Sequence, residues 1–428
     1  MSRLYFLLIT LLSLCPLCNY AQTDSTASSQ NLQRERSDED SPIRIHSDIR
    51  KTDRFIAMNS GFGEALLTNE YLRERNSMPS YIAGTFKFGM RANGNQWTDY
   101  AYGMPYIGVG IYSLNIFGKE SRMGTPVSIY LFSGSRIKTF SQRMWWAYEW
   151  NLGMSFNWNP YDPFDNPYNV TLGSSVNAHI ALASYIAWEI SRRWTFNFGV
   201  QLTHFSNGAQ KLPNKGLNLY SGFFQADFLL DKRKEFKKPD PSELVPPPFR
   251  KRIDYDITAT VSSHQITFDT VGTGLPTEFL NKKFTVLGMT FSPMYVPTYK
   301  YKFGPFIDFL YDESIGAKAY MRRNPADGHD YIRYSYGSVG SRFSLGLGMK
   351  GEVVLPYYSV TGQLGYDVIH ADDMLPRLYQ VIALKLPFGD CLYGAVGIRA
   401  TNFSRAQCIY ASIGYAIPQV FHRRQYLE

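Results

Sequence analysis

Long hydrophobic runs and cysteines are scarce in this 428-residue sequence. Beyond the N-terminus no run of 18 apolar residues occurs, which excludes membrane-spanning helices. Only four cysteines are present, and the sequence has no CxxC pair, phosphate-binding loop or dinucleotide fingerprint. Aromatic residues, by contrast, make up 16% of the chain. Because Tyr and Trp favour the boundary between an apolar layer and water, two classes remain: a secreted β protein and a transmembrane β-barrel.

The N-terminus has the features of an export signal. Arg3 precedes the apolar stretch Leu4 to Leu14, which is too short to span a bilayer and is followed by Ala21. We predict a signal peptide over residues 1–21. A lipoprotein signal is the alternative, but the two cysteines of this segment lack the small residues that a lipid-attachment site needs before them. Residues 22–50 are polar and charged, and they are predicted to be a disordered lead-in.

The formal charge of +8 is spread along the chain except for a cluster between Lys232 and Arg252. A nucleic-acid binder would carry clustered basic residues within a recognisable motif, and no such motif is present, so nucleic acid is not an expected partner. Two interpretations of the surplus stay open. One is ordinary solubility, and the other is weak attraction for anionic lipid head groups.

From Phe55 onward, apolar residues recur at every second position, which is typical of strands whose two faces meet different surroundings. His179 and Glu189 lie on the polar face of one such segment, and we predict that they belong to a polar network in the lumen. The apolar faces of the three clearest segments are Met144, Trp146, Tyr148, Trp150, Leu152, Met154, Phe156 and Trp158; Val176, Ala178, Ile180, Leu182, Ile186, Trp188 and Ile190; and Trp194, Phe196, Phe198, Val200 and Leu202.

These faces favour a transmembrane barrel over a soluble sandwich. Each runs for roughly 10 residues, the length at which a tilted strand crosses a bilayer, whereas soluble strands average about 5–6 residues. The connections also alternate in length, as they do in outer-membrane barrels. Ser191-Arg192 and Phe388 to Asp390 are tight, whereas Asn159 to Gly173, Asn207 to Leu217 and Asp312 to Val339 are long.

Candidate strands number about eight before Asp231 and about eight after Arg252. The segment 232–252 between them is charged, contains three consecutive prolines and cannot be a membrane strand. The predicted fold is therefore an all-β, antiparallel up-and-down outer-membrane barrel of about sixteen strands. Two arrangements stay open: tandem eight-stranded units over 51–231 and 253–428, or one larger barrel with a decorated turn.

Polar side chains converge at the end of one predicted strand. His204 and Ser206 continue the parity of the lipid-facing residues after Leu202, so the imidazole and the hydroxyl are neighbours on one face. Asn218 shares this face at the start of the returning strand. A histidine in this position could accept the proton of a serine nucleophile. If the mature chain starts in the periplasm, the strand of His204 is the seventh and ends at the outer leaflet.

The stretch His204-Phe205-Ser206-Asn207-Gly208, followed by Pro213-Asn214-x-Gly216-x-Asn218, resembles the PagL family of lipid A 3-O-deacylases, also called acyloxyacyl hydrolases. The resemblance covers about residues 51–231. It implies an eight-stranded outer-membrane barrel that hydrolyses an ester-linked acyl chain of lipid A with a Ser-His-Glu triad. Carried over, Ser206 is the nucleophile and His204 the general base, while Asn207, Asn214 and the backbone N–H groups around Gly208 are candidates for oxyanion stabilisation.

The acidic position of the family's triad falls on Asn218, which is a departure. Asparagine can orient a histidine through its carbonyl oxygen but supplies no negative charge, so we expect weaker activation of Ser206. A barrel that keeps the geometry without the activity is the competing interpretation. The motif has a partial second occurrence, or echo, at Asn402 and Ser404, in which Asn402 stands in place of the histidine. A degenerate duplication and chance both explain it. No catalysis is expected there.

The sequence thus predicts a Gram-negative outer-membrane esterase whose substrate is the lipid A of lipopolysaccharide. No cofactor and no metal are expected, because His370 with Asp372 and Asp373 is more simply a solvated loop. A homodimer is one assembly that this location allows. The alternative function is a non-catalytic barrel, either a porin or a structural, lipid-binding protein.

Overall fold

The computed structural model describes residues 52–68, 79–117, 121–231, 244–268, 282–326, 328–370, 376–389, 391–403 and 405–420. The predicted signal peptide and lead-in lie outside these ranges, as do residues 232–243 of the predicted linker, Asp372, Asp373 and Ser404. Within the described ranges, no helix is long and apolar enough to cross a membrane.

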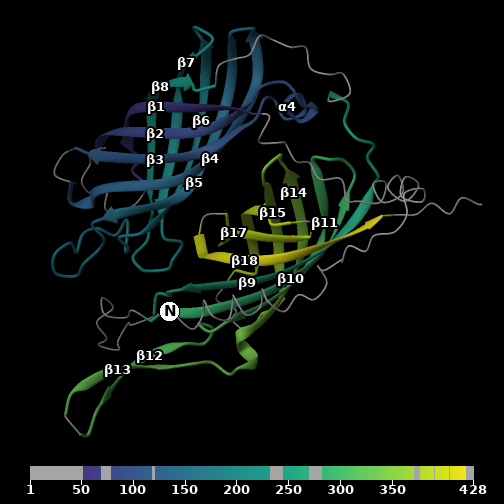
Figure 1. The fold of residues 1–428 in the computed structure, drawn as a ribbon. Coiled ribbons are helices and arrows are strands. Elements are labelled where there is room, and N and C mark those ends of the chain that lie inside the picture. Colours follow the sequence, from purple (N-terminus) through teal and green to yellow (C-terminus); the bar gives the residue numbers. More distant parts are fainter. Residues whose placement is uncertain are drawn as a thin grey trace, which may run out of the picture. The chain divides into compact units, whose positions relative to one another are not determined.

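Eight antiparallel strands form a first closed barrel, in which each strand pairs with the next and β1 pairs with β8 (Figure 1). A short helix, α4 (Trp97–Ala101), lies between β2 and β3. The strands are β1 (Thr52–Ala65), β2 (Ser80–Ala92), β3 (Tyr106–Ile116), β4 (Gly124–Ser141), β5 (Met144–Trp158), β6 (Asn177–Glu189), β7 (Trp194–Ser206) and β8 (Leu217–Leu229).

A second closed barrel follows along the chain, and it closes through the pairing of β18 with β9. Its strands are β9 (Arg252–His264), β10 (Phe284–Val296), β11 (Tyr301–Asp312), β14 (Phe343–Val354), β15 (Ser359–Ile369), β16 (Leu378–Pro387), β17 (Leu392–Thr401) and β18 (Arg405–Val420). The prediction of about sixteen barrel strands is confirmed, and of the two arrangements left open the structure has two eight-stranded barrels.

The long connection expected after Asp312 is not a simple loop. It contains a separate two-stranded sheet formed by β12 (Lys318–Arg323) and β13 (Asp330–Ser335). Most other connections of the second barrel differ in length between its two ends. The segments that join β10 to β11, β14 to β15 and β16 to β17 are short and lie at one end. At the other end the segments that leave β9, β11 and β15 are longer, and the one that leaves β17 is again short. Outer-membrane barrels place such long connections outside the cell.

Side chains alternate between the two faces of the wall as the period-two pattern predicted. On β7, Val200 is 64% exposed and Leu202 56% exposed, whereas Gln201 between them and Thr203 beside them are buried. One predicted outward residue departs from the pattern. Trp158 is buried, because Asn157 adopts a left-handed conformation with φ of 65° and shifts the parity at the end of β5.

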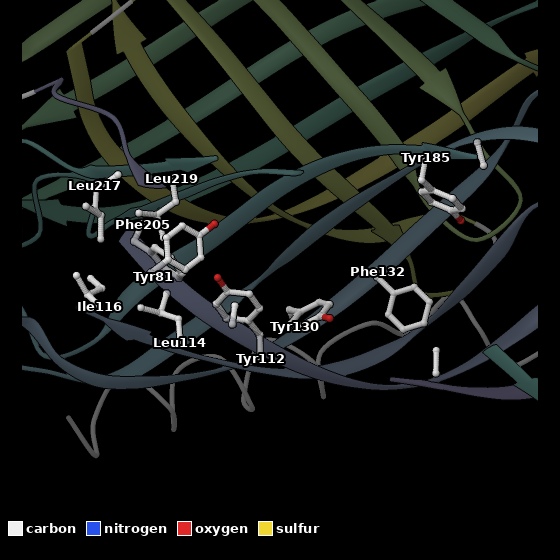
Figure 2. Packing of buried hydrophobic residues seen from close by; sticks show 14 of the residues in the cluster. Tyr81, Tyr112, Leu114, Ile116, Tyr130, Phe132, Tyr185, Phe205, Leu217 and Leu219 are labelled. Carbon is white, nitrogen blue, oxygen red and sulfur yellow. The ribbon is translucent and has the colours of Figure 1, made fainter. Parts of the chain in front are cut away.

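The lumen of the first barrel is filled by side chains, as expected for eight strands. Figure 2 shows tyrosines and phenylalanines of this cluster pointing inward from several strands. Lys87 lies among them and bonds Glu149 at 2.5 Å and Gln225 at 2.8 Å. His179 differs from the polar network that was predicted for it, because its ring packs between Tyr112, Tyr130 and Phe205 and neither nitrogen has a hydrogen-bond partner among the described residues.

The lumen of the second barrel is ionic rather than aromatic. Lys385 bonds both Asp256 at 2.9 Å and Glu352 at 3.0 Å, and Lys350 lies 3.2 Å from Asp256. Arg399 bonds Asp308 at 2.8 Å, which ties a second pair across the interior. These charges are buried, and they are satisfied by one another, as buried charges must be.

Candidate active site

Three polar side chains meet at the end of β7 and the start of β8. Register pairs His204 directly with Asn218, and Ser206 lies two residues further along the same face of β7. His204 Nδ1 is 2.7 Å from Asn218 Oδ1, and His204 Nε2 is 3.0 Å from Ser206 Oγ. The imidazole therefore bridges the carboxamide and the hydroxyl, with one ring nitrogen toward each.

This chain of contacts lies on the outward side of the wall. It continues the exposed row of Phe198, Val200 and Leu202, whereas the neighbouring Phe205 points into the lumen and is fully buried. The imidazole of His204 is half-buried and Ser206 is 6% exposed. Hence the site combines partial shielding from solvent with an opening toward the surroundings of the barrel rather than its interior.

The loop after β7 is held in shape by two asparagines. Asn207 donates from Nδ2 to the carbonyl of Lys211 at 2.8 Å, and its backbone N–H donates to Asn214 Oδ1 at 3.1 Å. These bonds engage the backbone N–H and one side-chain N–H of Asn207, one of the predicted oxyanion residues. The N–H of Gly208 and the Nδ2 group of Asn214 have no hydrogen-bond partner within the described residues, so they are among the donors available to a ligand.

Gly216 sits against the imidazole of His204. It has φ of 76°, a conformation that favours glycine, and a Cβ atom there would lie 2.9 Å from His204 Cε1. The connection between β5 and β6 fixes this position, because the N–H groups of Lys215 and Gly216 donate to the carbonyls of Val170 and Thr171 at 3.2 and 3.0 Å. Sequence reasoning noted Gly216 only as part of a motif and missed this contact.

The β5–β6 connection owes its own shape to buried carboxamides. Asn169 donates to the carbonyl of Asn159 at 2.9 Å, and Asn166 donates to the carbonyl of Pro160 at 3.1 Å. At the tip of the same connection, the backbone N–H groups of Asp165 and Phe164 hold the pKa of Asp162 below its usual value. The asparagines of this segment therefore fix the backbone at Val170 and Thr171, and this backbone in turn holds Gly216 against His204.

A residue from a distant part of the sequence completes the contacts of Asn218. Its Nδ2 group donates to Thr68 Oγ1 at 2.8 Å, and its backbone carbonyl accepts from the N–H of Leu66 at 2.8 Å. Thr68 follows β1, which pairs with β8 where the barrel closes. No local sequence pattern signals this residue, because only the closure of the barrel brings it to the site.

Two other sequence features concern metal binding and the echo of the motif. No group of three His, Cys, Asp or Glu side chains among the residues the structure describes is placed to hold a metal ion. The echo of the motif lies at the end of β17, the seventh strand of its own barrel, where Asn402 and Phe403 adopt positive φ angles in a tight turn. Asn402 thus ends the strand instead of extending a lipid-facing row.

Comparison with protein families decides the assignment. Residues 84–226 match the model described as lipid A 3-O-deacylase (PagL), and residues 253–419 match the C-terminal domain of acyloxyacyl hydrolase. The chain belongs to the PagL family. The resemblance suggested by the motif over 51–231 therefore extends to the second barrel. With the two closed barrels, this membership makes the chain an outer-membrane acyl hydrolase of the lipid A deacylase family.

Solved structures offer only distant likeness. The siderophore receptor PirA from Pseudomonas aeruginosa is 9% identical, with a TM-score of 0.20 over 87% of this chain and 81% of the receptor. The translocator domain of the autotransporter NalP from Neisseria meningitidis is 12% identical, with a TM-score of 0.16 over 93% of this chain and 98% of that domain. Scores this low carry no argument. No curated protein matches the sequence significantly.

Proposed function

We propose that this PagL-family member removes an ester-linked acyl chain from lipid A with Ser206 as nucleophile and His204 as general base. The observation that supports the proposal is the unbroken contact chain from Asn218 through His204 to Ser206. Asn218 Oδ1 can only accept a hydrogen bond, so it selects the tautomer with the proton on Nδ1. That tautomer leaves a lone pair on Nε2, which faces the serine hydroxyl.

The reaction then follows a two-step acyl transfer. His204 Nε2 takes the proton of Ser206 as Oγ attacks the ester carbonyl carbon. The protonated imidazole returns this proton to the leaving alcohol oxygen, which frees the deacylated lipid and leaves an acyl-serine. A water molecule, deprotonated by the same imidazole, attacks the acyl-serine. The Oγ–acyl bond breaks, the imidazolium returns the proton to Ser206 Oγ, and the fatty acid is released. Asn218 stabilises the imidazolium with a dipole rather than a charge.

The tetrahedral intermediates carry a negative oxygen that needs donors. The Gly208 N–H and the Asn214 Nδ2 group are two donors of the adjoining loop that have no partner among the described residues. Asn207 shapes the loop that presents them. One oxyanion donor in other hydrolases is worth about 10²–10³ in turnover, so the same loop is expected to matter as much as the base.

The outward orientation of the site defines how substrate arrives. Because Ser206 continues a row of lipid-facing side chains at the end of an outward-running strand, an acyl chain reaches it by lateral diffusion in the outer leaflet, and no deep pocket is required. Every group in this scheme comes from the first barrel, so one chain is sufficient. Export by a signal peptide cleaved after Ala21 is part of the same proposal.

The test is the lipid A acylation pattern of cells that express single variants. The unaltered protein is expected to remove one acyl chain from lipid A, as measured by mass spectrometry. Lipid A from cells with Ser206→Ala or His204→Gln is expected to keep that chain. Ser60→Ala is the matched control, because Ser60 is an outward-facing serine on β1 without a hydrogen bond to any described residue. Identical lipid A in cells with and without the unaltered protein would refute the proposal.

A non-catalytic barrel is the second candidate. The porin form of this alternative requires an open lumen, whereas both interiors are occupied by side chains in the structure. A structural or lipid-binding barrel would tolerate Ser206→Ala with no change in lipid A. The same experiment therefore separates the two functions.

A further inference from the structure

The carboxamide of Asn218 raises a problem that a carboxylate does not have. Its two ends are chemically different, and only one orientation places an acceptor against His204 Nδ1. If the amide rotated by half a turn, its N–H group would face Nδ1 and favour the opposite tautomer. In that tautomer Nε2 carries a proton and cannot accept one from Ser206. Something must therefore select the orientation seen in the structure.

We propose that Thr68 is the positioning residue that sets the orientation of Asn218. Its hydroxyl oxygen accepts a hydrogen bond from Asn218 Nδ2 at 2.8 Å, on the side of the amide opposite His204. The Thr68 hydroxyl has an acceptor for its own proton in the carbonyl of Leu66, 3.5 Å away, and donation to that carbonyl leaves lone pairs of Oγ1 for the amide. A polar side chain facing the amide nitrogen in this way disfavours the rotated form.

The backbone holds Thr68 in place. The N–H of Leu66 donates to the carbonyl of Asn218 at 2.8 Å, which extends the β1–β8 pairing past Ala65. The N–H of Thr68 donates to the carbonyl of Leu66 at 2.8 Å, which turns the chain so that the threonine reaches the amide. Thr68 acts through Asn218 and does not contact the reacting atoms. This inference rests on the proposed function of Ser206 and His204.

The test is a double-mutant cycle in the full-length protein. Thr68→Val, which keeps the shape but removes the acceptor, is expected to lower kcat about tenfold with little change in KM. Thr68→Ser restores the acceptor and is expected to restore kcat. In an Asn218→Asp background the two carboxylate oxygens are equivalent, so Thr68→Val is expected to cost much less there. Equal losses in both backgrounds, or no loss in either, would overturn the role of Thr68.

A second readout does not depend on turnover. Nitrogen NMR of the protein labelled at its histidines reports which ring nitrogen carries the proton. The His204 signal, identified through its absence in His204→Gln, is expected to show the Nδ1-protonated form and to shift toward the other tautomer in Thr68→Val. An unchanged tautomer would count against the inference. If Ser206→Ala loses activity while Thr68→Val keeps the kcat of the unaltered protein, the proposed function is supported and only the role of Thr68 is refuted.

A different observation concerns the ribbon formed by β12 and β13, whose two faces differ. One face, called here the basic face, carries Lys318, Tyr320 and Arg322 on β12, which lie opposite Ser335, Arg333 and Tyr331 on β13. All six are exposed. The opposite face is partly covered, since Tyr334 lies 5.6 Å from Phe268 between ring centroids.

The basic face has cations without partners. Lys318, Arg322 and Arg333 form no ion pair with a described residue, and the ribbon's Asp330 lies on the other face, opposite Arg323. The ribbon leaves the barrel from the end of β11, the end with the long connections. In an outer-membrane barrel this end faces outward, where the neighbouring molecules are lipopolysaccharides with phosphorylated sugars.

We infer that the basic face binds the phosphorylated saccharide of lipopolysaccharide. Arginine presents paired N–H groups that match phosphate, and tyrosine offers an apolar ring and a hydroxyl that suit a sugar face. On the basic face Arg322 pairs with Tyr331, and Tyr320 pairs with Arg333. Phosphate-binding and sugar-binding side chains therefore lie next to one another. An isolated two-stranded ribbon is marginally stable in water, so a bound saccharide would also stabilise it. This inference does not depend on the chemistry at Ser206.

Neighbouring arginines provide a matched pair of variants. The full-length protein in detergent micelles is titrated with the water-soluble carbohydrate of fully deacylated lipopolysaccharide, which lacks the ester that the enzyme would cleave. Arg322→Gln on the basic face is expected to raise Kd about fivefold, whereas Arg323→Gln, with the same charge change on the other face, leaves Kd unaltered. Removal of the phosphates from the carbohydrate is expected to abolish the difference. Equal effects of the two substitutions, or no binding by the unaltered protein, would overturn the inference.

Discussion

At the scale of single residues, Asn218 determines how strongly the imidazole can be activated. The carboxamide oxygen lies 2.7 Å from His204 Nδ1. In the proposed mechanism it selects the tautomer of His204 but gives the imidazolium of the transition state no counter-charge. In Ser-His-Asp enzymes the same loss of charge with a change of tautomer costs about 10⁴ in turnover. In the proposed mechanism the contacts of the Asn218 amide preserve the tautomer, so we expect a large part of that loss to be avoided.

Asn218→Asp is therefore expected to raise kcat. Aspartate has the same shape as asparagine, so it keeps the contact with His204 Nδ1 and adds the missing charge. We expect a gain of roughly tenfold, measured as the rate of fatty acid release from lipid A in mixed micelles. Asn115→Asp serves as control, because Asn115 is an exposed residue near the end of β3 and adds the same charge without touching the imidazole. A lower rate in Asn218→Asp would contradict this account of the triad.

At the scale of elements, the period of the strands allowed the three site residues to be predicted from the sequence. The contacts that the connecting segments make with these residues could not be predicted. Alternation alone was sufficient to place His204, Ser206 and Asn218 on one face, because a strand has only two faces. The contribution of Thr68 depends on the pairing of β1 with β8, which joins residues more than 150 positions apart in sequence and has no local signature. The shifted parity at Trp158 was likewise invisible, since it arises from one left-handed residue at a strand end.

Gly216 tests the coupling between the loops and the imidazole. In Gly216→Ala the new Cβ lies 2.9 Å from His204 Cε1 at a φ of 76°, so either the ring or the loop must move. We expect activity to fall at least tenfold while the barrel remains folded, as judged by its heat-dependent migration in gels. Gly84→Ala is the matched control, because Gly84 lies in β2 with open space around it. Similar activities for the two variants would show that the contact is unimportant.

The interior of the first barrel makes a separate prediction about stability. Lys87 is buried and bonds Glu149 and Gln225, so Lys87→Met leaves a carboxylate without its partner in a closed lumen. Breaking such a pair costs about 3–5 kcal/mol in free energy of unfolding. Urea titration of the protein in lipid vesicles, followed by tryptophan fluorescence, measures this loss. Lys138→Met, at an exposed position of β4, is expected to change stability by much less.

At the scale of the whole molecule, the number of strands per barrel decides whether the protein can conduct. Sixteen strands in one barrel would enclose a water-filled channel, and the sequence left that arrangement open because strand counts do not reveal where a sheet closes. The pairings of β1 with β8 and of β18 with β9 close the sheet twice instead. Each barrel then has an interior of a size that side chains can fill.

The side chains that fill the second barrel predict how the protein behaves in a conductance measurement. A cavity in its interior has a volume of about 50 Å³, room for very few water molecules, and its lining includes Lys350, Lys385 and Arg399, which are held by buried carboxylates. The first barrel is filled by aromatic side chains. The purified protein in planar lipid bilayers is therefore expected to give no conductance steps of the size that a sixteen-stranded porin shows in the same bilayers. Steps of that size would show that the lumens are open, and they would restore the porin as an alternative to the esterase.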